Sequence, residues 1–142
     1  MICNHYINTR WRIRSARNHR RWINRVIESE KKSAGRIDFI FADDETVRDV
    51  NIEFLNHDYC TDVITFDYSS GKEVSGEIYI GTGTVTKNAE IYNEWVGEEM
   101  RRVMVHAVLH LCGYGDSDNN AASVMRNKED IYLRLYRDEF HV

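Results

Sequence analysis

One ten-residue stretch, from Val103 to Cys112, constrains the fold more than any other part of this 142-residue sequence. On a helix its side chains are apolar on every face, except at His106 and His110. A helix that is apolar all round must be surrounded by the rest of the chain. We therefore expect a central helix, spanning about residues 98–112, that packs against neighbours on several sides.

The two histidines of this helix are four residues apart, a spacing that places both imidazoles on one face, where they can bind one metal ion. Gly113 and Gly115 follow and allow the chain to turn, which would bring Asp116 to the same ion. Three protein ligands with an open position are typical of catalytic zinc. The alternative is that each histidine hydrogen-bonds to a neighbouring carbonyl or carboxylate, but the spacing favours the metal. Asp118 competes as third ligand, although its position suits the start of the last helix.

The residue after the first histidine separates this site from the HExxH metalloproteases, which carry their general-base glutamate there. Here it is Ala107, which accepts no proton and is expected to leave room for a substrate or a metal-bound water. Phosphodiester hydrolysis fits better, because a metal ion can itself generate hydroxide and polarise a phosphoryl oxygen. Arg102, one turn before His106, could supply positive charge to the reacting phosphate. Its alternative role is that of an exposed surface charge.

Hydrophobic periodicity predicts the other elements. Runs of β-branched and aromatic residues indicate strands at residues 2–7, 37–42, 62–68 and 73–80, the last two as a hairpin. Apolar stripes indicate helices at about residues 15–30, 43–55, 84–95, 98–112 and 118–139. We expect an α+β fold, a small mixed sheet of about four strands covered by about five helices, forming one domain over residues 1–142.

Several side chains of two helices are expected to face the core. In the second helix they are Val47, Val50 and Phe54; in the last they are Ala121, Val124, Met125, Ile131, Leu135 and Tyr136. Asp62 opens a strand and has two roles open to it, orienting a ligand imidazole or capping the strand. Glu77 is expected to face solvent, and the histidines without ligand spacing are expected at the surface: His5, His19, His57 and His141.

The net charge of −4 conceals an asymmetry along the chain. Residues 28–142 carry twelve basic residues against all twenty-three acids, whereas residues 1–27 carry no acid. A basic segment interleaved with Trp11 and Trp22 could hold the phosphates of a nucleic acid. The alternative is a solvated helix face, and charge alone does not separate the two. The arginines of this segment are Arg10, Arg12, Arg14, Arg17, Arg20, Arg21 and Arg25.

The number and spacing of the cysteines indicate the redox environment of the protein. Cys3, Cys60 and Cys112 are odd in number, far apart and form no CxxC pair. Free thiols in a reducing cytoplasm are the simplest interpretation. The sequence predicts neither a signal peptide nor a transmembrane span, so no membrane partner is expected.

Four sequence blocks resemble the YbeY family of ribosomal RNA maturation endoribonucleases. The family motif H-G-x-L-H-L-x-G-Y-D-H is similar to HAVLHLCGYGD at residues 106–116. The pattern L-N-x-x-[FY]-R-x-x-D-x-x-T-D-V-L-S-F is similar to VNIEFLNHDYCTDVITF at residues 50–66, without a gap. A short G-[DE]-I block falls at residues 76–78, and the family's Met-x₃-Glu falls at Met125 and Glu129. Together these blocks span the domain in the expected order.

The resemblance implies a metal-dependent endoribonuclease that acts on single-stranded RNA near the 3′ end of the 16S ribosomal RNA, with the small ribosomal subunit as partner. It also implies a role in ribosome assembly and quality control, with His106, His110 and Asp116 holding one Zn²⁺ ion. Two residues depart from the family. Asp116 replaces a histidine, which lowers the charge of the site and makes Mn²⁺ or Fe²⁺ more competitive. Leu55 replaces an arginine thought to assist phosphate chemistry.

Two other functions stay open on the sequence. One is a non-catalytic RNA-binding assembly factor with a structural metal, which the loss of the arginine at position 55 favours. The other is a metal-dependent oxygenase or hydrolase of small molecules, because two histidines and a carboxylate also form non-haem iron sites. The arginine-rich segment argues against this second function.

Overall fold

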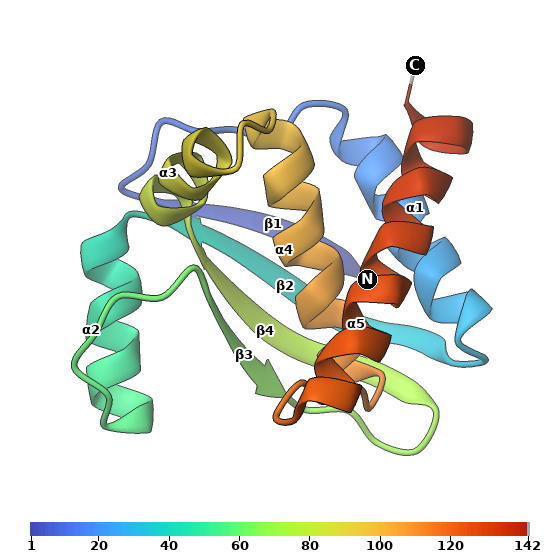
Figure 1. The fold of residues 1–142 in the computed structure, drawn as a ribbon. Helices are drawn as coiled ribbons and strands as arrows, with labels where there is room; N and C mark the ends of the chain where they lie inside the picture. Colours follow the sequence, from blue (N-terminus) through green and yellow to red (C-terminus); the bar gives the residue numbers. More distant parts are fainter. Residues whose placement is uncertain (142) are drawn as a thin grey trace.

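The computed structural model describes residues 1–141 and contains a four-stranded mixed sheet (Figure 1). Three strands are parallel, and the hairpin partner β3 runs antiparallel to β4. Along the sheet the order is β1 (Ile2–Ile7), β2 (Ser33–Ala42), β4 (Glu73–Gly81) and β3 (Val63–Asp67). The predicted α+β architecture is confirmed.

Five α-helices accompany the sheet in the described chain. A five-residue π-helix, Tyr136–Phe140, continues the last of them. The helices are α1 (Ala16–Ser29), α2 (Asp44–Leu55), α3 (Thr82–Ile91), α4 (Val96–Leu111) and α5 (Asn119–Leu135). Asp43 caps α2 by accepting from the Thr46 amide, and Asp118 caps α5 by accepting from the Ala121 amide, as polar residues at helix starts do.

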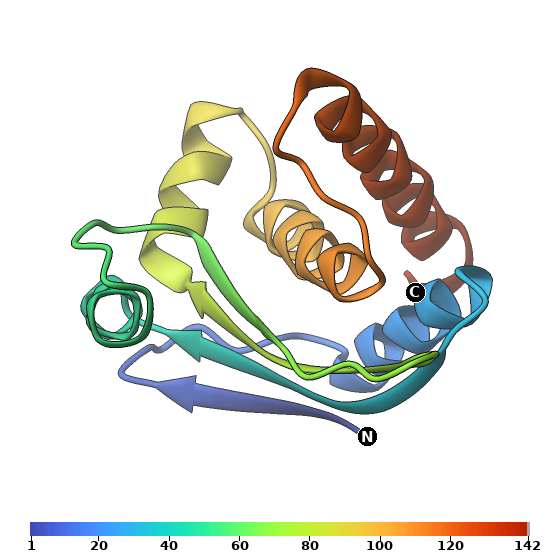
Figure 2. The same cartoon turned by 90° about the horizontal axis from the view of Figure 1, so that it is seen from below.

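The metal-site helix is central, as its apolar surface predicts. Figure 2 shows α4 above the sheet, with α3 on one side and α5 on the other. Met104, Val105, Val108 and Leu109 are almost completely buried, whereas His106 is partly exposed. The helix therefore buries most of its circumference and opens only along the stripe that carries its polar residues.

The two faces of the sheet pack in two different hydrophobic clusters. Alternate side chains of a strand point to opposite faces. Ile37, Phe39 and Phe41 of β2 join the main core with α1, α4 and α5. On the other face, Ala42 packs in a smaller cluster with Val47 of α2.

A glycine lets the last turn of α4 lie directly on the sheet. A Cβ atom at Gly76 would lie 2.5 Å from the Phe66 carbonyl oxygen and 2.9 Å from the Leu111 side chain. Real side chains do not come so close, so the approach of α4 to β4 depends on glycine here. This contact fixes the end of the helix from which the candidate ligands project.

Some element boundaries differ from the sequence prediction. Strand β2 begins at Ser33, four residues before the predicted start at residue 37, and includes Gly35. Helix α3 ends at Ile91, four residues before the predicted end at Trp95. Eight residues of β2 pair in parallel with β1 or β4, and tertiary pairing of this kind overrides weak local propensity.

Three side chains predicted to face the core are exposed: Phe54 by 61%, Val124 by 41% and Ile131 by 59%. In α5 the buried stripe passes through Met125, Glu129 and Tyr132. Because this buried face includes a carboxylate, a search for apolar residues alone predicts the wrong face of α5. The prediction for Val124 and Ile131 is wrong for that reason; Phe54 only touches the ring of Phe66 at the edge of the smaller cluster.

Two residues of α1, Trp22 and His19, are buried, and only for His19 was a place at the surface expected. Trp22 is fully buried, and its Nε1 donates to the Tyr132 carbonyl oxygen at 2.8 Å, so it anchors α1 to α5 and has no face free for RNA. His19 is only 6% exposed, and burial lowers its pKa to about 4, with a further contribution from the Arg101 charge. Its expected place at the surface is wrong.

The cysteines are free thiols in the described chain: Cys3 is half-buried, Cys60 exposed and Cys112 buried. Burial raises the pKa of Cys112 to about 11, which keeps that thiol protonated and unreactive. Within residues 1–141, no helix combines the length and the apolar character that crossing a membrane requires.

Candidate metal centre

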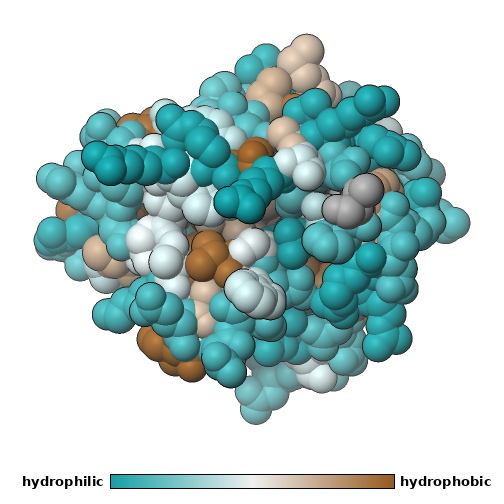
Figure 3. Space-filling view, turned by 90° about the horizontal axis from the view of Figure 1, so that it is seen from above, coloured by the Kyte–Doolittle hydropathy of each residue, from teal (hydrophilic) through white to brown (hydrophobic). Residues whose placement is uncertain are grey.

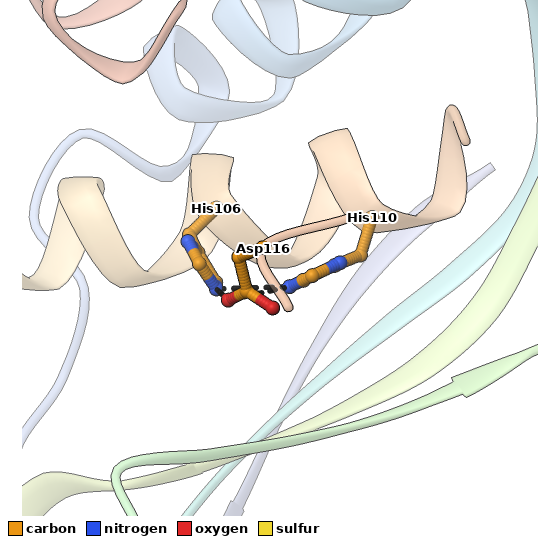
Figure 4. Close-up of side chains that lie close together, drawn as sticks. All are labelled: His106, His110 and Asp116. Atoms are coloured by element: carbon orange, nitrogen blue, oxygen red, sulfur yellow. Dashed lines mark hydrogen bonds and ion pairs between the residues drawn. The ribbon is translucent and has the colours of Figure 1, made fainter. Parts of the chain in front are cut away.

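Two side chains of α4 and one from the turn after it bring three ligand atoms together (Figure 4). The Nε2 atoms of His106 and His110 are 3.0 Å apart, and Oδ2 of Asp116 lies 3.4 Å from each. Tetrahedral zinc, with Zn–N distances of about 2.0–2.1 Å, holds neighbouring ligand atoms roughly 3.3 Å apart. The triangle therefore has the size of one face of a zinc coordination shell.

The second nitrogen of each imidazole has its own partner, and these partners define the tautomers. Nδ1 of His106 lies 2.7 Å from Oε2 of Glu129, and Nδ1 of His110 lies 2.8 Å from the Tyr114 carbonyl oxygen. A carbonyl oxygen and an ionised carboxylate can only accept, so we assign the proton of each ring to Nδ1. Each neutral ring then presents a lone pair at Nε2.

The sequence left two explanations for the histidine pair, hydrogen bonds to neighbouring acceptors or a shared metal ion. With this assignment the two are compatible, because each concerns a different nitrogen of the ring. The Nδ1 atoms make the hydrogen bonds to a carbonyl and a carboxylate, and the Nε2 atoms converge with Asp116. Three acceptors then face one another with no proton between them. Such a set repels itself unless a cation lies among its members, so these atoms fit a divalent metal ion.

The turn that carries the third ligand depends on one glycine. Gly113 takes a φ of +108°, which residues with a side chain rarely adopt. The Tyr114 amide donates to the Leu109 carbonyl oxygen at 3.0 Å, closing the helix. Gly115, expected to help the turn, has no positive φ. Asp118 caps α5, which leaves Asp116 as the carboxylate at the histidines.

A buried carboxylate ties this turn to the rest of the molecule. Glu30, at the end of α1, accepts from the Tyr114 hydroxyl at 2.6 Å, from Lys128 Nζ at 3.2 Å and from the Tyr132 hydroxyl. Burial alone would raise the pKa of Glu30, but these three donors lower it overall. The turn is thereby attached to both α1 and α5. Sequence reasoning missed Glu30, because nothing in its spacing links it to residues more than eighty positions away.

A second buried carboxylate links the site to Arg102. Glu129, 5% exposed, accepts from Arg102 Nη1 at 2.9 Å through one oxygen and faces His106 with the other. Arg102 also donates to Asp130 at 2.9 Å. Burial lowers the pKa of His106, but the hydrogen bond and charge of Glu129 outweigh it, so the pKa is raised overall. Glu129 entered the sequence analysis only as part of a family pattern.

The candidate ligands lie where two hollows of the surface meet. One, of about 630 Å³, lies between α3, α4 and α5, and the other, of about 590 Å³, lies between α2, β3 and α4. His106 and Asp116 line both. The hollows form one groove with the metal centre in its middle, a shape suited to a chain-like substrate.

The other residues that the sequence indicated for the site lie in or near this groove. Asp62 lines both hollows, but the partner of the His106 ring is Glu129. Leu55 lines the second hollow, 42% exposed. Ala107 is fully buried, so the expectation that it leaves room for substrate is wrong. One residue further along a helix points about 100° away, here into the core.

The chain matches the family model described as "Endoribonuclease YbeY" over residues 5–137. It is 46% identical over 124 residues to the endoribonuclease YbeY of Flavobacterium psychrophilum, covering 87% of this chain and 89% of the relative. It is 44% identical over 118 residues to that of Flavobacterium johnsoniae, covering 83% and 85%.

A solved structure shares the fold. It is a solution structure of a protein from Thermotoga maritima, with a TM-score of 0.69 over 97% of this chain and 91% of that chain. Sequence identity is 23%, so this likeness concerns the fold alone.

Proposed function

Because the chain belongs to the YbeY endoribonuclease family, we propose that it is a single-domain, metal-dependent enzyme that cleaves single-stranded RNA. The proposed substrate is the 3′ end of the 16S ribosomal RNA, reached on the small ribosomal subunit in the cytoplasm during assembly and quality control. One observation carries the metal-dependent chemistry: two imidazole nitrogens and a carboxylate oxygen lie within 3.4 Å of one another in an open groove.

The proposed ligands are His106, His110 and Asp116, and the proposed ion is Zn²⁺. When bound, such an ion lowers the pKa of water and polarises a phosphoryl oxygen, which phosphodiester hydrolysis requires. The two Nδ1–H hydrogen bonds hold the rings so that their lone pairs point into the groove. Because one ligand is a carboxylate, Mn²⁺ and Fe²⁺ compete better here than at three histidines.

A catalytic role is also proposed for Arg102, which lines the groove one turn before His106. A guanidinium has five N–H donors, and Glu129 and Asp130 each take one of them. The remaining donors can reach a phosphate oxygen in the groove, where positive charge would stabilise the transition state. If so, kcat of Arg102→Ala falls on single-stranded RNA; an unchanged rate removes the role.

The experiment for the whole proposal combines metal content, folding and activity. Protein purified without added metal is analysed for bound elements, and a nuclease assay on single-stranded RNA is run with and without a chelator. We expect about one ion per chain and loss of cleavage on chelation, with circular dichroism unchanged. A chelated protein that unfolds would instead indicate a structural metal. Mapping of 3′ ends after incubation with the small subunit tests the ribosomal substrate.

A further inference from the structure

A second cavity, of about 720 Å³, lies at the opposite end of α4 from the ligand group. It is enclosed by the segment that precedes α1, the beginning of α4 and the π-helix at the C-terminal end, which Figure 1 places together at the top of the molecule. Figure 3 views that end of the molecule, where apolar patches lie among hydrophilic side chains. None of the described residues that line the cavity is an aspartate or a glutamate.

Two arginines give the cavity positive charge that no carboxylate cancels. Arg12 and Arg14 line it, and no ion pair joins either one to an acid within residues 1–141. Arg12 donates to the carbonyl oxygens of Thr9 and Trp11 and lies 4.3 Å from the ring centre of Tyr6. These contacts hold the guanidinium in place without neutralising it.

A third arginine adds an unsatisfied donor. Arg101 lies over the ring of Tyr136, 4.4 Å from its centre, and bonds to Glu98 at 3.2 Å. Glu98 is shared, because Arg137 also donates to it at 2.6 Å. The Nε atom of Arg101 is buried and has no hydrogen-bond partner in the described chain. An oxygen atom of a ligand could satisfy a donor of this kind.

Aromatic side chains supply the other half of the recognition. Trp95, at the start of α4, is 84% exposed, and Trp11 lies half-buried beside the cavity. Three residues before Trp95, Tyr92 is 66% exposed and lines the metal groove. Aromatic surface therefore extends from the cavity across the α3–α4 connection toward the metal centre. A base can stack on such faces whatever its identity.

We infer that this cavity binds a nucleotide of single-stranded RNA, with its base against Trp95 and its phosphates at Arg12 and Arg14. The inference rests on the proposed endoribonuclease function and gives the substrate a second point of attachment. Nine residues of helix, about 13.5 Å, separate Arg101 from His110, so one RNA strand of several nucleotides can occupy both places. An acidic peptide would use the arginines but leave the tryptophan faces unused.

Binding of RNA that cannot be cleaved tests the inference. The probe is a fluorescein-labelled, 2′-O-methyl 12-nucleotide single strand, titrated by anisotropy against the metal-loaded protein. Trp95→Ala should weaken binding about tenfold, because one stacked base is lost, and Trp95→Phe should restore most of it. Arg14→Gln should weaken binding severalfold and reduce the salt slope by about 0.7, the value for one phosphate contact. Arg134→Gln is the matched control, an exposed arginine of α5 that lies outside the cavity and outside the basic N-terminal segment.

Two outcomes would overturn the inference: Trp95→Ala binds like the wild type, or Arg134→Gln loses as much affinity as Arg14→Gln. Cleavage of an unmodified strand is measured in parallel, so that the two proposals fail separately. Loss of binding in Trp95→Ala without any cleavage by the wild type supports the cavity and contradicts the enzyme. Cleavage with unchanged binding in Trp95→Ala supports the enzyme and contradicts the cavity.

Discussion

The two ends of α4 have opposite charge environments. Around the ligand end, the carboxylates of Asp62, Asp116 and Glu129 line the groove, and Arg102 is paired with two acids. Around the other end, arginines line a cavity that contains no acid among its described residues. Carboxylates attract a cation, whereas arginines attract the phosphates of a polynucleotide. Placing the two sets at opposite ends of one helix keeps the arginines of the proposed RNA site from competing for the acids near the proposed metal.

The largest effect should come from removing a ligand. In His110→Ala we expect the bound ion to be lost and cleavage to fall by more than the roughly 10–100-fold that loss of an outer partner costs. Binding of the uncleavable RNA strand should stay close to that of the wild type. Elemental analysis and a cleavage assay provide the measurement. A variant that retains one ion per chain would contradict the assignment of this ligand.

At the arginine end, pH should act on stability through His19. Burial lowers the pKa of this imidazole from 6.5 to about 4. Below pH 6.5 the unfolded chain takes up a proton that the folded chain refuses, so the free energy of unfolding falls as pH drops from 6.5 to 4. The loss is about 3 kcal/mol for a shift of this size. Urea unfolding of wild type and His19→Gln across this range should give diverging curves; parallel curves would show that His19 is not held neutral.

At the ligand end, the charge of Glu129 should contribute to metal affinity. Glu129→Gln keeps an acceptor for the His106 ring but removes the negative charge, and metal affinity should fall about 10–100-fold. Asp130→Asn is the matched control, because Asp130 also bonds to Arg102 but does not contact an imidazole. Its effect should be below about threefold, as expected for an exposed ion pair. Titration with Zn²⁺ under competition from a chelator distinguishes the two; equal losses would show that Arg102 mediates the effect.

The smallest effect should come from Tyr114→Phe. The change removes one of three hydrogen bonds to Glu30 and should lower the free energy of unfolding by about 1 kcal/mol. The Tyr114 carbonyl stays in place, so metal affinity should change less than about twofold. Tyr68→Phe, in which the exposed Tyr68 loses its bond to Glu77, is the control for stability. A large drop in metal affinity would mean that Glu30 positions the ligand turn.

Much of the fold follows from local patterns in the sequence. The helix from residue 98 to 112 and the hairpin were predicted within two residues of their observed ends, because their periodicity agrees with their burial. Prediction failed where partners distant in sequence decide the outcome. Strand β2 begins earlier than predicted because Ser33 and Ala34 pair with β4, and Val124 is exposed because the buried stripe of α5 includes Glu129.

The candidate site divides in the same way. The convergence of His106, His110 and Asp116 follows from helical spacing and a glycine turn, so the sequence was sufficient to predict it. The atoms that orient the rings could not be found by spacing. One is a main-chain carbonyl, which leaves no trace in residue identity, and the other is Glu129, twenty-three residues after His106.

That difference between the two orienting acceptors has an evolutionary consequence. The His110 ring is held by the main-chain carbonyl oxygen of residue 114. Any amino acid at that position supplies this oxygen, provided that the backbone keeps its conformation. The His106 ring is held by a side chain that a single codon change can remove. A point mutation at position 129 can therefore change the hydrogen bond that orients the His106 ring. A point mutation at position 114 leaves the acceptor of the His110 ring in place.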